Sequence, residues 1–106
     1  MKQETIDRIQ KFIIDRDWDQ FHSPANLAKS ISIEANELLE CFQWSDTEYD
    51  LQHVKEELAD VIVYCQDMLD KLNLDVDEIV NMKMVSALSK GGFSMHTNPV
   101  IMIARC

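Results

Sequence analysis

Two pairs of acidic residues have the types and spacing of a metal site. Glu34 with Glu37 and Glu57 with Asp60 each have an i, i+3 spacing within a strongly helical segment. Residues three apart share one face of a helix, so each pair presents two carboxylates together. Clustered carboxylates repel one another unless a cation neutralises them. Because oxygen ligands suit a hard divalent ion, we predict a site for Mg2+, with Mn2+ as a substitute.

Both pairs border the apolar stripe of their predicted helix and lie away from its polar face. A helical projection of residues 27–44 places Glu34 and Glu37 at the flank of the stripe. The second pair has the same position in residues 50–72. Acidic pairs are common on solvated helix surfaces, where they bind no metal. Two pairs bordering apolar stripes in neighbouring helices favour a site formed by both helices.

The composition indicates one small helical domain. The chain has 106 residues, of which 46% are hydrophobic, and contains 2 glycines and 2 prolines. A chain of this length forms one domain with a modest core. The net charge of -9 argues against a nucleic acid polymer as partner, because the phosphate backbone requires basic patches. Single nucleotides stay compatible with this charge, because a bound cation inverts the local field.

The cysteines and the N-terminal segment predict a cytoplasmic protein. Cys41, Cys65 and Cys106 are widely spaced and odd in number, without a disulfide framework or a zinc pattern. We expect Cys41 and Cys65 to be buried, reduced thiols. Residues 1–10 lack the apolar run of a signal peptide, and no segment approaches the length of a membrane span. We therefore expect no membrane partner.

Periodicity and capping residues predict an all-α protein. The four expected helices cover about residues 4–15, 24–44, 50–72 and 76–89. Ser23 and Pro24 are a typical N-cap and first helical residue. Two capping boxes precede the later helices: Ser45 with Glu48, and Asp75 with Glu78. Short links between the helices predict an antiparallel four-helix bundle.

The third predicted helix indicates an oligomer. Residues 61–65 are apolar on every side, which is typical of a helix buried on more than one side. In a chain this small we expect the second side to contact another subunit, giving a homo-oligomer, either a dimer or a tetramer. We treat residues 1–106 as a single domain, with a helical core at about 4–90 and an irregular tail at 91–106.

The segments around the acidic pairs resemble the MazG-like family of all-alpha nucleotide pyrophosphohydrolases. LAKSISIEANELLECFQW at 27–44 contains ExxE and EELADV at 56–61 contains ExxD, the two halves of the family signature. RDWDQFHSPANL at 16–27 is similar to the dCTP pyrophosphatase branch. The resemblance covers about residues 12–83. The acidic pattern alone has low specificity, and the added RDWDQFH and FQW segments make the match specific.

The resemblance implies an activity: Mg2+-dependent hydrolysis of nucleoside triphosphates to monophosphate and pyrophosphate, as house-cleaning of the nucleotide pool. It implies that Glu34, Glu37, Glu57 and Asp60 bind the metal. A glutamate is the natural acceptor of a proton from the attacking water, and we take Glu37 as the candidate, with Glu34 beside it. The expected substrate is deoxycytidine triphosphate or a modified form of it.

The resemblance also implies a pocket for the base and sugar. Trp18, Trp44 and Tyr64 match positions that form this pocket in similar enzymes, and flat rings stack on bases. His22 is a candidate for a hydrogen bond to the base or for closing the pocket. Each has a structural alternative: Tyr64 as a core residue, Trp44 as a helix-end packing residue, and His22 as a structural histidine.

The match is weaker towards the C-terminus. Lys83 fits the phosphate-contacting lysine of the family, whereas Ala87 and Leu88 stand where relatives usually carry Asn and Arg. This departure keeps a second reading open, a helical nucleotide-binding or interaction module with weak or no turnover. A ferritin-like di-iron bundle is disfavoured, because its Glu-x-x-His motif is absent. A truncated toxin-related regulator has no direct support in these residues.

Overall fold

The structure is a computed structural model that describes residues 1–89. These residues form four α-helices and one short 3-10 helix: α1 (Gln3–Asp15), η1 (Asp19–Phe21), α2 (Pro24–Glu40), α3 (Leu51–Lys71) and α4 (Val76–Ser89). No strand occurs within residues 1–89, which confirms the all-α class. The chain divides into two compact units between Asn73 and Leu74. The predicted tail at 91–106 lies outside the described residues.

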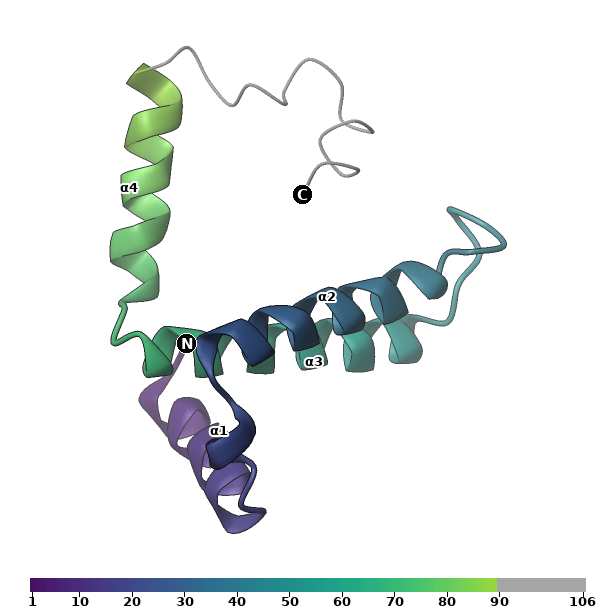
Figure 1. The fold of residues 1–106 in the computed structure, drawn as a ribbon. Helices are drawn as coiled ribbons and strands as arrows, with labels where there is room; N and C mark the ends of the chain where they lie inside the picture. The colour runs from purple at the N-terminus through teal and green to yellow at the C-terminus, as the bar shows by residue number, and fades with distance from the viewer. Residues whose placement is uncertain (90–106) are drawn as a thin grey trace. The chain divides into compact units, whose positions relative to one another are not determined.

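The first unit contains the antiparallel pair α2 and α3, with α1 packed against α3. Figure 1 shows α2 and α3 side by side, joined at one end by the loop at 41–50. Gln10 of α1 donates a hydrogen bond from Nε2 to Asp70 Oδ2 of α3 at 2.9 Å. Leu27 is fully buried and Ile13 is 4% exposed, so the core of this unit is small.

Three of the predicted helices end within about one residue of their predicted ends, whereas α2 is shorter than predicted. It ends at Glu40 and not near Trp44, because the backbone turns tighten after residue 40. The N–H groups of Cys41, Phe42 and Gln43 donate to carbonyls three residues back, at 3.1, 3.0 and 3.2 Å. Such i→i+3 bonds belong to a 3-10 turn, which ends an α-helix.

Capping hydrogen bonds form at all three predicted helix starts, although one of them closes a turn. Ser23 Oγ accepts from the Asn26 N–H, and Asp75 Oδ2 accepts from the Glu78 N–H at 3.0 Å. Ser45 Oγ accepts from the Glu48 N–H at 2.9 Å, but α3 begins only at Leu51. The Ser45 bond therefore stabilises the loop between α2 and α3.

Asp50 is the N-cap of α3. Its Oδ1 accepts hydrogen bonds from the N–H groups of Gln52 at 3.0 Å and His53 at 3.4 Å. We expect Asp50→Ala to lower the free energy of unfolding by about 1 kcal/mol, because these N–H groups lose their acceptor. Asp50→Asn retains an acceptor oxygen and should lose little. Urea denaturation of both variants measures the difference, and an equal loss in both would contradict a role for the cap.

The first unit leaves large apolar side chains on its surface. Among them are Ile33 (60% exposed), Leu39 (63%) and Ile62 (45%), because α2 and α3 cover each other on one side only. Cys41 and Cys65 are free thiols of intermediate exposure, so the prediction that both are buried was wrong. Within residues 1–89, no helix has the length and apolar character needed to cross a membrane.

Candidate metal centre

Helices α2 and α3 bring three of the four predicted ligands together. Oxygen atoms of Glu34, Glu37 and Glu57 all lie within 4.8 Å of one another, and we call these residues the carboxylate cluster. Glu34 and Glu37 are one turn apart on α2, and Glu57 faces them from the antiparallel α3. Asp60, one turn after Glu57, is outside this group of three. Its charge still acts on the cluster by raising the pKa of both Glu34 and Glu57.

The cluster disfavours its own full ionisation. Burial, followed by the neighbouring Glu37, raises the pKa of Glu34 from 4.5 to about 7. Burial and Glu37 also raise the pKa of Glu57, and His53 opposes this effect. His53 Nε2 lies 3.2 Å from Glu57 Oε1. Without a cation, a proton is therefore held among these carboxylates in the neutral pH range.

The donor set fits a hard divalent cation. Glu34 Oε2 and Glu57 Oε2 are buried, and neither has a hydrogen-bond partner among the described residues. A buried polar atom without a partner is costly, and a cation between α2 and α3 would supply that partner. The cluster offers carboxylate oxygens alone, which suits Mg2+ or Mn2+ better than a soft metal.

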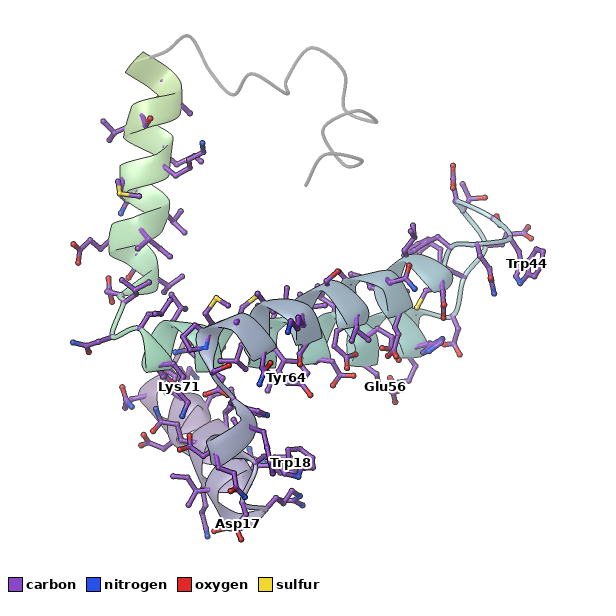
Figure 2. The ribbon with its side chains drawn as sticks, in the orientation of Figure 1. Asp17, Trp18, Trp44, Glu56, Tyr64 and Lys71 are labelled. Carbon is purple, nitrogen blue, oxygen red and sulfur yellow. The ribbon has the colours of Figure 1, made fainter. Side chains whose placement is uncertain are left out.

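An aromatic cavity of about 260 Å³ lies next to the cluster, within the same unit. It is lined by Glu34 and Asp60 on its acidic side and by Phe12, Ile13, Trp18, His22, Val63 and Tyr64 elsewhere. The centroid of the His22 ring lies 6.5 Å from that of the Trp18 ring and 5.9 Å from that of the Tyr64 ring. Figure 2 shows Tyr64 on α3 and Trp18 in the segment after α1. One cavity therefore joins acidic and aromatic groups that are distant in sequence.

Two predicted substrate residues are not brought to this cavity within the first unit. Trp44 is 90% exposed, and Figure 2 shows it in the loop at the end of α2, away from Tyr64. The early end of α2 places Trp44 outside the helix. Lys83 lies on α4, which belongs to the second unit.

Two residues near the site were missed by sequence reasoning. His53 precedes Glu57 by one helical turn, and this i, i+4 spacing is a signal that could have found it. Asp67 forms a hydrogen bond through Oδ2 with His22 Nδ1. The two residues are 45 positions apart, so no local sequence pattern reveals the contact. Spacing alone would pair Asp67 with Lys71 at i+4, whereas the structure pairs Lys71 with Asp19.

The fold and the site define a class of protein: an all-α fold with a carboxylate-rich centre between two helices. Comparisons with known proteins agree with this class. The chain belongs to the MazG-like family, whose profile matches residues 29–98. It is 38% identical to dCTP pyrophosphatase 1 of Mus musculus over 91 residues, covering 76% of this chain and 54% of the mouse protein. The Homo sapiens dCTP pyrophosphatase 1 is 36% identical over the same shares. This chain thus spans about half the length of these relatives.

A solved structure supports the same assignment. The crystal structure of a pyrophosphatase from Archaeoglobus fulgidus superimposes with a TM-score of 0.77 and 36% sequence identity. The match covers 83% of this chain and 89% of the archaeal chain. The resemblance derived from the acidic pairs and the flanking segments is therefore confirmed at the level of the family and its fold.

Proposed function

We propose that this protein hydrolyses nucleoside triphosphates to monophosphate and pyrophosphate with Mg2+, as house-cleaning of the nucleotide pool. The observation that carries the proposal is that Glu34 and Asp60 line the same cavity as Trp18, His22 and Tyr64. A triphosphate needs a cation beside the carboxylates, and its base needs flat apolar surfaces. The acidic and the aromatic residues that line the cavity meet these two needs. Similarity to dCTP pyrophosphatases supports a weak preference for dCTP-like substrates.

The residues have separate roles in this proposal. Glu34, Glu37, Glu57 and Asp60 would hold the metal, and two of them, Glu34 and Asp60, line the cavity that would receive the substrate. Bound Mg2+ would offset phosphate charge and help to activate water. Glu37 is the proposed acceptor of the proton from that water, with Glu34 beside it.

Further side chains are proposed to contact the substrate. Trp18, His22 and Tyr64 contact the base and sugar, and Phe12 and Val63 add apolar surface to the same cavity. Lys83 of α4 is the proposed phosphate contact. The domain boundaries and the antiparallel four-helix bundle stay predictions, because each unit is described by itself.

We also propose a homo-oligomer, a dimer or a tetramer. The apolar side chains that α2 and α3 leave exposed, including Leu39 and Ile62, support a covering second copy. In such an assembly Trp44 would contact the base that is bound in the cavity of a neighbouring copy. Sedimentation of the full chain tests this part of the proposal, and a monomer at micromolar concentration would contradict it.

A binding module without turnover is the second candidate function. It is favoured by Ala87 and Leu88, which replace the Asn and Arg expected from the resemblance. Both side chains are apolar, so neither position offers a group that could bind phosphate or base through a hydrogen bond. This candidate retains nucleotide binding and lacks hydrolysis.

Pyrophosphate release from a panel of canonical and modified dNTPs, with and without Mg2+, tests the function. We expect release that depends on Mg2+, with monophosphate as the co-product. The best substrate would define the base preference. Folded protein that binds nucleotide and releases no pyrophosphate would support the binding module, and orthophosphate as the product would exclude both readings.

A further inference from the structure

The Asp67 carboxylate is buried against the His22 ring. Asp67 Oδ2 lies 2.6 Å from His22 Nδ1, and the two side chains are 6% and 12% exposed. Asp67 comes from α3, and His22 directly follows η1. A short, shielded contact between an acid and an imidazole fixes the orientation of the ring.

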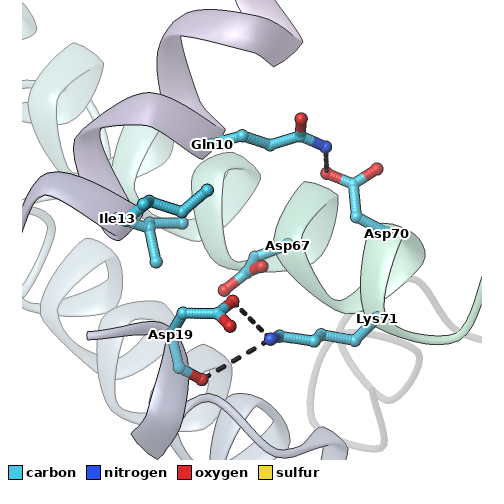
Figure 3. Close-up of a pocket in the computed structure, with 7 residues that line it drawn as sticks. Gln10, Ile13, Asp19, Asp67, Asp70 and Lys71 are labelled. Atoms are coloured by element: carbon cyan, nitrogen blue, oxygen red, sulfur yellow. Dashed lines mark hydrogen bonds and ion pairs between the residues drawn. The ribbon is translucent and has the colours of Figure 1, made fainter. Parts of the chain in front are cut away.

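A second contact from α3 holds the segment that carries His22. Asp67 lines a different cavity, of about 190 Å³, together with Asp19 and Lys71. Figure 3 shows this cavity, with Lys71 beside Asp19. Lys71 Nζ pairs with Asp19 Oδ1 and also donates to the Asp19 carbonyl at 3.5 Å. The His22 N–H in turn donates to this carbonyl at 3.1 Å. Residues one turn apart on α3 thus position both the backbone and the ring of His22.

The contact with Asp67 decides which hydrogen-bonding group His22 offers to a ligand. An ionised carboxylate has only lone pairs, so the hydrogen of the contact is on Nδ1. In a neutral imidazole the other nitrogen, Nε2, is then an acceptor. Because Nδ1 is occupied by Asp67, Nε2 is the ring nitrogen left for a ligand in the aromatic cavity that His22 lines.

We propose that Asp67 is a positioning residue that sets base specificity, by holding His22 as a hydrogen-bond acceptor for bases that carry an exocyclic amino group. The inference rests on the proposed function, since it concerns the base half of the same cavity. Cytosine and adenine present an amino donor on this edge, whereas uracil and thymine present a carbonyl at the equivalent position. A carbonyl facing the Nε2 lone pair gains no hydrogen bond and leaves two buried acceptors opposed.

The tautomer is measured first, on the full chain without substrate. Nitrogen-15 NMR of the histidine rings at about pH 8.5, above the ordinary histidine range, separates the two neutral tautomers. The His22 signals are assigned by their loss in His22→Gln. We expect the Nδ1–H form in the wild type. The Nε2–H form would overturn the proposal, whether or not any variant folds.

Base selectivity is measured second, as the ratio of kcat/KM for dCTP to that for dUTP. Asp67→Ala has no acceptor for Nδ1, and Asp67→Asn can donate as well as accept, so neither fixes the tautomer. We expect the ratio to fall about tenfold in either variant, as for the loss of one hydrogen bond in a buried site. Asp70→Asn is the matched control, because Asp70 is on the same helix and bonds to Gln10 and Gln66. Its ratio should equal that of the wild type.

Failure of this inference is distinguishable from failure of the proposed function. An unchanged dCTP to dUTP ratio in both Asp67 variants, with wild-type turnover intact, overturns the role of Asp67 alone. If the wild type hydrolyses no triphosphate, binding of dCMP and dUMP replaces turnover as the measurement. Preferential binding of dCMP that Asp67→Ala abolishes would then support the inference, and equal binding would overturn it.

Discussion

Glu34→Gln should abolish Mg2+-dependent pyrophosphate release, and Asp60→Asn should do the same. We expect a loss of at least about 100-fold, because each change removes an anionic ligand from a site that must offset the charge of a triphosphate. Glu34 Oε2 is buried without a partner among the described residues, and the neutral amide that replaces it supplies no anionic oxygen for a divalent cation. Steady-state pyrophosphate release, with Mg2+ binding followed by calorimetry, measures both effects.

A neighbouring glutamate supplies the matched control. Glu56 adjoins Glu57 on α3, is exposed, and accepts a hydrogen bond from Gln52 at 3.4 Å. Glu56→Gln makes the same chemical change outside the cluster and should retain full activity. Circular dichroism should show unchanged helix content in all the variants. Full activity in Glu34→Gln or Asp60→Asn would remove that residue from the metal site.

The metal-free protein should lose stability as the pH rises through the neutral range. Glu34 has a pKa of about 7 in the folded chain against an ordinary value of 4.5, so the folded state holds this proton more tightly. Its stabilising contribution is complete below about pH 4.5 and is lost as the pH rises through about 7. The raised pKa of Glu57 acts in the same direction. We expect a decrease of several degrees in Tm across this window.

Mg2+ should reverse this loss most strongly at the alkaline end. Carboxylates bind a cation in their ionised form, so metal and proton compete for the cluster. Thermal unfolding at about pH 5 and pH 8, with and without Mg2+, measures the competition. Glu34→Gln carries no titratable group at this position, so its Tm should depend less on pH and on Mg2+. Parallel pH profiles for Glu34→Gln and the wild type would contradict this account.

The sequence was most informative where structure depends on near neighbours. The i, i+3 spacing of Glu34 and Glu37 and the capping hydrogen bond of Asp75 are properties of single helices, and the structure contains both. The facing of Glu57 towards α2 was also predictable, because both pairs border apolar stripes that pack together. The end of α2 was not predictable from the sequence, since the tighter turns after Glu40 depend on the loop that leads into α3.

Contacts between distant segments could not be predicted in the same way. His22 and Asp67 are 45 positions apart, and their contact depends on how η1 packs against the C-terminal half of α3. The pairing of Lys71 with Asp19 arises from the same packing. No periodicity within one helix encodes such a contact, because many acidic residues in this chain are equally suitable partners for a histidine or a lysine.

The unpartnered oxygens of Glu34 and Glu57 also bear on how this protein would respond to engineering. A screen that rewards heat resistance in the absence of divalent cations would favour a neutral residue in place of Glu34, since it relieves the crowding of carboxylates at an oxygen that has no partner among the described residues. At Glu57 the same change would also cost the contact of Oε1 with His53 Nε2. The selected variants would resist thermal unfolding better and would have lost a proposed metal ligand. Selection for robustness should therefore be carried out with Mg2+ present, so that thermal resistance and ligand binding are rewarded together.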